Sequence, residues 1–216
     1  MQLLYISGFL GLSLVLLAYL LRAKKRIDNE TARKLVHFAH ALVVAGWPAF
    51  IGYWFVIVGE IIFLGVVVVD REYKLFHQLK EINRKSWGEF FFPLGVIGLA
   101  LIAPPTWVFV ISLLLLGLAD GAAAIIGQHI QSLSYNVFGY KKSLAGSLAF
   151  FGVALTIILA VLTAVPTGID AHHFLLAVLI VPLITTIVEN ISPYGSDNLT
   201  VPLAVYISLL GLGVIT

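Results

Sequence analysis

The stretch TWVFVISLLLLGLADGAAAIIGQH, residues 106–129, decides how the rest of the chain is read. It is long and apolar enough to cross a bilayer as one helix, which takes about 20 mostly apolar residues. One carboxylate, Asp120, nevertheless lies inside it. An ionisable group in a spanning segment costs about 3 kcal/mol and is a functional candidate by default. The stretch therefore predicts a membrane protein with chemistry near Asp120.

The composition of the whole chain agrees with this prediction. Of its 216 residues, 60% are hydrophobic and only 11% are charged, whereas a soluble domain carries about 25% charged residues. A water-soluble globular fold is therefore excluded. Thirteen basic and 11 acidic residues leave a net charge of +2, which argues against a nucleic-acid partner. The absence of cysteine excludes disulfides, zinc-thiolate sites and iron–sulfur sites.

Seven further apolar runs accompany this one, and prolines lie between several of them. We expect an all-α fold: a polytopic integral membrane protein of about eight transmembrane helices, in a single domain that covers residues 1–216. Two of the runs are short and could be half-spans or tilted helices. The eight candidate helices cover residues 3–21, 33–47, 49–70, 90–103, 106–129, 145–165, 170–189 and 199–216.

The basic residues fix an orientation for these helices. All 13 Lys and Arg residues fall in alternate connections, within residues 22–34, 71–85 and 141–142. The positive-inside rule makes that side cytoplasmic. The longer polar loops lie on the same side, so we expect an active site that faces the cytoplasm. Without cysteine or a signal peptide, we expect a prokaryotic plasma membrane.

Small residues surround Asp120. Gly117 and Gly121 form a small-xxx-small pair, and Ala124 and Gly127 continue that face. Such a face is typical of close helix packing and could serve a homodimer as well as an internal contact. Small residues alone do not explain the carboxylate. In a cytoplasmic cavity it would suit a hard cation such as Mg²⁺, or a proton.

A second polar group opens the run 33–47. Arg33 and His37 are four residues apart and share a helix face. Arg33 and Lys34 could be snorkelling anchors at the membrane interface, whereas His37 lies one turn deeper, where we favour a function. For His40 both interpretations stay open, and two histidines without a third ligand do not make a metal site.

A third intramembrane group is Glu60, between Gly59 and Ile61 in the run 49–70. It could be a buried partner for a histidine, a polar brace or a functional residue. No motif decides among these interpretations.

The segment Lys141-Lys142-Ser143-Leu-Ala-Gly146-Ser147 precedes and opens the run 145–165. Ser143 is a good helix N-cap, and the free N–H groups of a helix N-terminus form an anion site. Two lysines add positive charge, and Gly146 permits close backbone approach. We expect phosphate binding here; the alternative is an ordinary capped helix with two lysines on the positive side. The segment is not a P-loop, because the required glycine pattern is missing.

The connection between the last two runs holds two acids and two amides: Glu189, Asn190, Asp197 and Asn198. Asp197 could simply cap the last helix, and Glu189 could simply end the helix before it. The connection lies on the same side as the lysines, however. Together with Asp120 it would supply oxygen ligands for a Mg²⁺-nucleotide.

The polar motifs follow one another in a specific order. In that order the chain resembles the polyprenol kinase family, which includes dolichol, phytol and farnesol kinases and the CTP-dependent diacylglycerol kinase. The resemblance covers residues 31–204. The motifs are Arg33-Lys34-x-x-His37, Gly88-Glu89-x-x-x-Pro93, Asp120-Gly121-x-Ala-x-x-x-Gly127, Lys142-Ser143-x-x-Gly146-Ser147, Glu189 and Asp197-Asn198-x-x-x-Pro202.

The resemblance implies an integral-membrane kinase that phosphorylates an isoprenoid or other lipid alcohol, with CTP or another nucleoside triphosphate as donor. We assign catalysis to Asp120, His37 and Arg33, with His37 or a carboxylate as the base. Mg²⁺ is assigned to Asp120, Asp197 and Glu189. The residues assigned to the nucleotide are Lys141, Lys142, Ser143, Gly146, Ser147, Gly121, Gly127 and Asn198.

One departure from the family pattern concerns the donor. Family members often carry a glycine with a basic residue shortly after the position of Gly127, whereas Gln128 and His129 follow here. This departure bears on the preference for a nucleobase.

Two other functions compete with the kinase. The family is distantly similar to phosphatidate cytidylyltransferases, which make CDP-lipids, but their His-Gly-Gly element is absent from this chain. An ion-coupled transporter could use Asp120, Glu60 and His37 as an ion path. Against a transporter, the polar groups gather on one side of the membrane.

Overall fold

The structure, a computed structural model, describes residues 29–73 and 87–215, together with residues 13, 17, 20, 21 and 24. The first expected helix, 3–21, therefore lies largely outside the described residues, as do the basic positions between residues 74 and 86. The side chain of Arg33, which is part of a helix, also lies outside the description.

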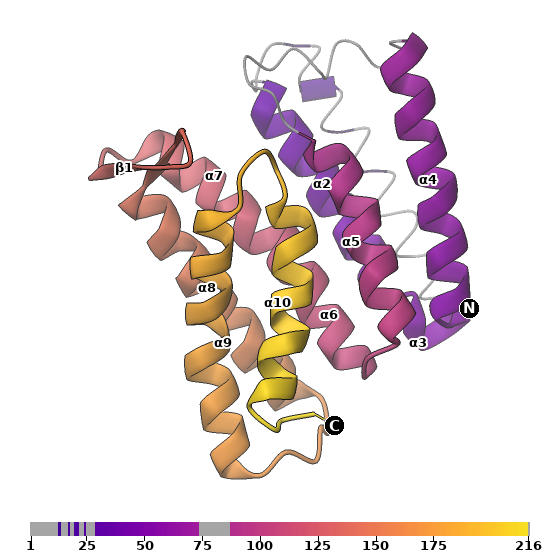
Figure 1. The fold of residues 1–216 in the computed structure, drawn as a ribbon, viewed down its shortest axis with the longest axis vertical. Helices are drawn as coiled ribbons and strands as arrows, with labels where there is room; N and C mark the ends of the chain where they lie inside the picture. Colours follow the sequence, from indigo (N-terminus) through magenta and orange to yellow (C-terminus); the bar gives the residue numbers. More distant parts are fainter. Residues whose placement is uncertain are drawn as a thin grey trace.

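The described chain is almost entirely helical, with one short β-hairpin (Figure 1). Seven of the eight expected runs fall on these helices. The hairpin was not expected from the sequence, so the all-α prediction holds except at residues 134–143. The elements are α2 (Asn29–Ala45), α3 (Pro48–Ile51), α4 (Tyr53–Tyr73), α5 (Gly88–Ile102), α6 (Thr106–Leu114), the π-helix η2 (Leu115–Ala119), α7 (Asp120–His129), β1 (Ser134–Val137), β2 (Tyr140–Ser143), α8 (Leu144–Ala164), α9 (Ala171–Ile191) and α10 (Asp197–Gly211).

Five helical segments of the described chain are long and apolar enough to cross a membrane. They are Lys34–Ile51, Tyr53–Tyr73, Thr106–His129, Leu144–Ala164 and Ala171–Ile191. The apolar helices α5 and α10 are shorter, at 15 residues each. The number of about eight transmembrane helices therefore stays a prediction.

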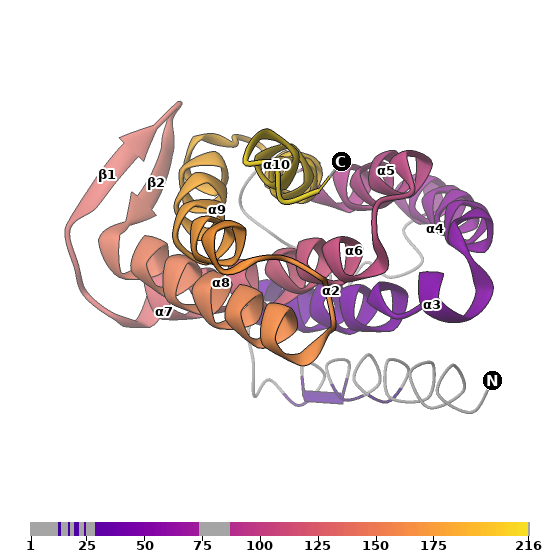
Figure 2. The same cartoon turned by 90° about the horizontal axis from the view of Figure 1, so that it is seen from below.

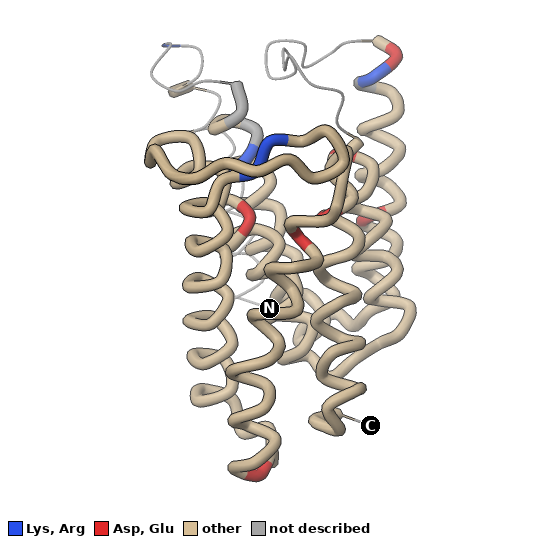
Figure 3. The backbone as a smooth tube through the Cα atoms, turned by 60° about the vertical axis from the view of Figure 1, so that its left-hand side comes forward, with Lys and Arg blue, Asp and Glu red and all other residues tan. Residues whose placement is uncertain are grey.

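The helices run roughly side by side, so that the bundle has two distinct ends (Figures 1 and 2). Figure 3 shows that the described Lys and Arg residues gather toward one end, which we call the polar end. The start of α2, the end of α7, the hairpin, the start of α8, the end of α9 and the start of α10 all lie there. This arrangement places the sequence motifs on one side of the molecule.

At the opposite end, the short connection between α8 and α9 is closed by a helix cap. Asp170 accepts hydrogen bonds from the backbone N–H groups of His172 and His173, at 2.9 and 3.0 Å. These bonds and the His173 ring hold the pKa of Asp170 below its usual value, the backbone N–H of His173 having the largest effect. Asp170 therefore serves the fold, far along α9 from the polar end.

Two apolar clusters fill the interior. The first joins α6 and η2 to α8, α9 and α10, with Phe150, Val181 and Val205 fully buried. The second joins α2, α4 and α5 to α6, with Phe92 and Phe109 at its centre. The segment from α6 to α7 thus lies between both halves and is the most buried of the five long segments.

This central segment is interrupted by one turn of π-helix directly before Asp120. The backbone N–H of Asp120 donates to the carbonyl of Leu115, five residues back, as well as to that of Gly117. Such a turn inserts one extra residue and is frequent at functional sites. The sequence predicts a continuous helix over 106–129, and the structure has it, with this local change of phase.

The outer faces of the bundle are apolar. On α9, the side chains of Leu175, Leu179, Leu183 and Ile187 are 52–56% exposed and recur every fourth residue, which places them on one face. On α4, Trp54 and Ile62 are more than 60% exposed. Soluble monomers rarely expose contiguous apolar patches of this kind.

Candidate active site

A cavity of about 350 Å³ opens among the helices near the polar end. The residues around it come from α2, α7, β2, the N-terminus of α8, the C-terminus of α9 and the N-terminus of α10, segments up to 164 residues apart in sequence. They include Lys34, Asp120, Gly127, Gln128, Tyr140, Lys141, Lys142, Ser143, Gly146, Ser147, Glu189, Tyr194, Asp197 and Asn198.

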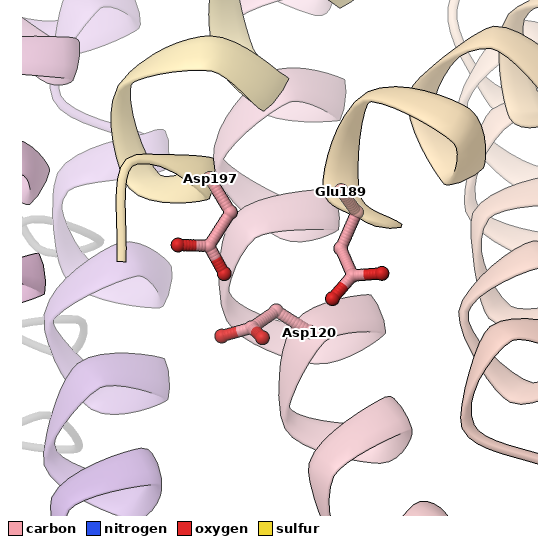
Figure 4. A group of neighbouring side chains, drawn as sticks. All are labelled: Asp120, Glu189 and Asp197. Carbon is pink, nitrogen blue, oxygen red and sulfur yellow. The ribbon is translucent and has the colours of Figure 1, made fainter. Parts of the chain in front are cut away.

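Three carboxylates meet in this cavity and form what we call the carboxylate cluster (Figure 4). Asp120 comes from the first residue of α7, Glu189 from the last turn of α9, and Asp197 from the first residue of α10. One oxygen of each lies within 4.8 Å of the others. Asp120 and Glu189 are buried, at 6% and 5% exposure.

Two lysines balance part of this negative charge. The ammonium group of Lys34 in α2 donates to Oδ2 of Asp120. The ammonium group of Lys142 in β2 donates to Oε1 of Glu189, and also to the Glu189 carbonyl at 3.2 Å. Asp120 and Glu189 are therefore each paired with a lysine in a mostly buried site.

Carboxylate oxygens are the ligands that Mg²⁺ prefers, usually one or two of them with water and substrate phosphates. The oxygen donor set of the carboxylate cluster, the short separation of its oxygens and its place on a cavity all fit a divalent cation. Asp120, Asp197 and Glu189 are the residues that could hold it.

The N-terminus of α8 also lines the cavity. Ser143 caps the helix as the sequence predicts: its Oγ accepts from the N–H of Gly146 at 3.1 Å. A Cβ added to Gly127 would lie 2.8 Å from Oγ of Ser143, and one added to Gly146 would lie 3.0 Å from the carbonyl of Ala123. The two glycines thus let α7 and α8 approach until the α8 N-terminus borders the cavity.

Ser147, one turn into α8, belongs to a small polar network. Its Oγ donates to Oδ1 of Asn190 at 2.9 Å, and the hydroxyl of Tyr135 in β1 donates to the same oxygen at 2.7 Å. The network ties the hairpin to α8 and to the end of α9. It therefore fixes the position of β2, which carries Lys142.

Asn198 connects the cavity to a histidine behind it. Its Nδ2 donates to the carbonyl of Gly88 at 3.2 Å, which leaves Oδ1 as the acceptor toward Nε2 of His37 at 2.9 Å. His37 Nε2 therefore carries the proton of this bond. His37 also packs edge-on against Phe92, with ring centroids 4.2 Å apart.

Ten of the assigned residues surround the cavity, and two of the described ones do not. His37 lies behind Asn198 and is not part of the lining. Gly121 is also outside the lining, and a Cβ there would meet nothing within 4 Å, so no close approach requires a glycine. The side chain of Arg33 lies outside the described residues. Gly117 lies on the same predicted small-residue face as Gly121. It packs inside the molecule, because a Cβ there would meet Ala41.

The sequence interpretation missed several residues of the cavity. Lys34 was not assigned to the site, and an interfacial anchor was one interpretation of it, yet its side chain is 9% exposed and bound to Asp120. Its neighbour in the motif Arg33-Lys34-x-x-His37 was favoured instead. Tyr140 and Tyr194 were not singled out at all, and only their flanking Lys and Gly residues could have pointed to them.

A second acidic site lies deeper in the bundle, away from the cavity. Glu60 of α4, 1% exposed, contacts Nε2 of His40 in α2 through Oε1 at 2.8 Å. The His40 ring packs against Phe63 and Phe92, at 4.3 and 4.8 Å between centroids. We call this the His40–Glu60 pair. It confirms the interpretation of Glu60 as a buried partner for a histidine.

Comparison with known proteins identifies the group to which the chain is related. The phytol kinase of Synechocystis sp. is 30% identical to it over 211 residues, which cover 91% of this chain and 85% of that protein. The chain belongs to the polyprenol kinase family. No protein-family model and no solved structure matches it.

Membership of the polyprenol kinase family confirms the resemblance inferred from the ordered motifs. The match covers 91% of the chain and therefore extends over both halves of the bundle, the half with the carboxylate cluster and the half with the His40–Glu60 pair. The resemblance to cytidylyltransferases, by contrast, has no counterpart in this comparison.

Proposed function

We propose that the chain is an integral membrane kinase that transfers the γ-phosphoryl group of a nucleoside triphosphate, by preference CTP, to a phytol-like isoprenoid alcohol. The observation that carries the proposal is the carboxylate cluster beside two lysines and a helix N-terminus, in one cavity of a chain whose relative is a phytol kinase. Phosphoryl transfer needs positioning and charge neutralisation more than covalent chemistry from the protein.

The donor phosphates are held at the α8 N-terminus. The positive end of the helix dipole attracts anions. The N–H groups of Leu144, Ala145 and Gly146 in its first turn donate to Leu133, Ser132 and Ser143, so the attraction comes from the dipole and the lysine beside it. Lys142 lies one residue before the N-cap Ser143 and adds a point charge. Binding of the donor would shift Lys142 from Glu189 toward the phosphate oxygens.

Magnesium, held by Asp120, Asp197 and Glu189, would supply neutralisation of the phosphate charge. With Glu189 and Asp120 so engaged, Lys34 and Lys142 would be released toward the transferring group. Lys34 reaches the cavity from α2, on the side of Asp120, and Lys142 from β2.

The acceptor is a lipid alcohol that enters between the helices with its hydroxyl toward the cavity. The bond between its oxygen and the γ-phosphorus forms as the bond from that phosphorus to the bridging oxygen breaks, and the nucleoside diphosphate leaves. A carboxylate oxygen of the carboxylate cluster takes the hydroxyl proton. His37 is a positioning residue instead, because its Nε2–H is engaged with Asn198.

The membrane setting rests on the five long apolar helices and on the exposed apolar faces of α4 and α9. We place the polar end in the cytoplasm of a prokaryotic cell, because the basic residues gather there. The chain contains no cysteine, so that single introduced cysteines can test this orientation cleanly. In intact cells an impermeant maleimide should label His172→Cys and spare Leu133→Cys until the membrane is permeabilised. The reverse labelling would contradict the orientation.

The activity is tested with purified protein in detergent, a panel of lipid alcohols, and CTP or ATP labelled on either the α- or the γ-phosphate. We expect the γ-label in a lipid monophosphate, with Mg²⁺ required and phytol among the acceptors. An α-label in the lipid would indicate cytidylyl transfer and overturn the kinase proposal. Absence of both labels in the lipid products with all acceptors would also overturn it.

A further inference from the structure

The lining of the cavity is divided by chemistry into two parts. One part holds the carboxylate cluster, Lys142 and the α8 N-terminus. The other holds two tyrosines, Tyr140 from β2 and Tyr194 from the connection between α9 and α10, whose ring centroids are 5.0 Å apart at an interplanar angle of 81°. Apart from these rings, Ala123 and Ala124, every residue around the cavity is polar or glycine.

The strand β2 sets the relation between the two parts. Side chains two residues apart in a strand point to the same face, and the residues lie about 7 Å apart along it. Tyr140 and Lys142 are therefore neighbours on one face, and both are half-buried, whereas Lys141 between them is exposed. The ring of Tyr140 is thus held two residues along β2 from Lys142, the lysine assigned to the phosphates.

Tyr194 is held by its backbone. Its φ is +58°, in the left-handed region that a bulky residue rarely adopts, and Gly195 follows with φ +83°. The Tyr194 carbonyl accepts from the N–H of Trp87 at 2.8 Å, which anchors the connection to the start of α5. Strain of this kind is found where a side chain must occupy a particular place.

We infer that Tyr140 and Tyr194 form the subsite for the nucleobase of the phosphoryl donor, an inference that rests on the proposed function. Aromatic rings offer a flat apolar surface on which a base stacks, whichever base it is. The alternative occupant, an isoprenoid tail, needs a long aliphatic surface, and the described residues around the cavity offer none.

Gln128 supplies the means to distinguish one base from another. It lies in the last turn of α7, is exposed, and borders the same cavity. Its carboxamide offers an NH₂ group as hydrogen-bond donor and a carbonyl oxygen as acceptor, so it can pair with the hydrogen-bonding edge of a base. Gln128 and His129 are the two residues at which this chain departs from the family pattern, and only Gln128 of the two borders the cavity. We therefore assign the choice between CTP and ATP to Gln128.

The test compares a donor that has a base with one that has none. Binding of CTP and of inorganic tripolyphosphate to the purified, detergent-solubilised protein is measured by calorimetry for wild type, Tyr140→Ala and Tyr194→Ala. Loss of base stacking should weaken CTP binding on the order of 5- to 100-fold and leave the affinity for tripolyphosphate unchanged. Tyr73→Ala, an exposed tyrosine at the same end of the bundle, is the matched control.

Further variants separate the ring from the hydroxyl and from folding. Tyr140→Phe and Tyr194→Phe should keep most of the CTP affinity, and Gln128→Leu should change the ratio of CTP to ATP affinity. Equal weakening of CTP and tripolyphosphate, or an effect on the KM of the alcohol alone, would overturn the nucleobase subsite. Because binding is measured without turnover, these outcomes stay distinct from a failure of the kinase proposal, which would show as an absence of labelled lipid with wild type.

Discussion

The carboxylate cluster and the His40–Glu60 pair are both acidic sites inside apolar helices, but their surroundings differ. Asp120 and Glu189 face a polar cavity and contact lysines from α2 and β2. Glu60 contacts one histidine, and aromatic rings enclose that histidine. Among the described residues, Oε2 of Glu60 is a buried oxygen without a hydrogen-bond partner.

The difference shows that an acid in an apolar helix does not by itself mark an active site. Burying an ionisable group is costly in either place. In the carboxylate cluster that cost is accompanied by several convergent donors and by access to solvent, which phosphoryl transfer requires. The His40–Glu60 pair, by contrast, joins α2 to α4, and neither of its residues lines the cavity. The following variants test this contrast, from the largest expected effect to the smallest.

Asp120→Asn should reduce turnover on the order of 10³-fold, the scale of losing one preorganised charge at a reacting centre. The variant keeps the size of the side chain, and its thermal unfolding in detergent should stay close to wild type. Steady-state transfer to phytol measures the effect. Near-normal turnover in the folded variant would move Asp120 to a structural role and remove the contrast with Glu60.

Lys142→Ala should weaken donor binding by about 10- to 100-fold, because it removes a hydrogen bond to a charged group worth about 1.5–3 kcal/mol. Lys141→Ala should have a smaller effect, since Lys141 also borders the cavity but is exposed, and solvent screens its charge more strongly. The KM for CTP measures both. Equal effects of the two variants would contradict the assignment of the main phosphate contact to Lys142.

Gly127→Ala should destabilise the protein by about 1–3 kcal/mol through overpacking, because its Cβ would lie 2.8 Å from Oγ of Ser143. The usual gain of about 0.5–1 kcal/mol from removing a helical glycine offsets only part of this. Chemical unfolding in detergent provides the measurement.

Gly121→Ala, in the same helix, is the matched control and should be neutral or slightly stabilising, because nothing lies within 4 Å of its Cβ. Similar losses in the two variants would mean that the contact between α7 and α8 does not depend on Gly127.

Glu60→Gln should have the smallest effect on function. The amide oxygen can still accept from His40, but a neutral acceptor is weaker, so we expect a loss of about 1 kcal/mol in stability and unchanged turnover. The thermal midpoint and the transfer rate are measured together. Lost turnover at an unchanged midpoint would place the His40–Glu60 pair in the chemistry.

Much of the fold could be predicted because apolar runs record burial directly in the sequence. The expected runs 145–165 and 170–189 match Leu144–Ala164 and Ala171–Ile191 to within two residues. The hairpin escaped prediction because its strands have four residues each and carry mostly polar side chains. Pairing between such strands is set by the elements they join rather than by their own pattern.

The convergence of Asp120, Lys142, Ser143 and Asp197 also followed from the sequence, because alternate connections share one side of a bundle. Which residues of α2 face the cavity did not follow. That depends on the rotation of the helix about its axis. The rotation of α2 is set by its packing on Gly117, where an added Cβ would meet Ala41 and Phe38. This packing turns Lys34, rather than His37, toward Asp120.

The π-helical turn before Asp120 has a consequence for how this chain can be aligned and shortened. Each residue of a helix advances the phase by about 100°, so the additional residue sets α7 at a different azimuth from α6. Deletion of one residue there, such as Leu118, would rotate the carboxylate of Asp120 away from Glu189 and Asp197, although all three acidic residues would still be present. The active-site geometry is thus encoded partly in a residue count, and a relative with an ordinary α-helix at this place should show a one-residue gap immediately before its aspartate.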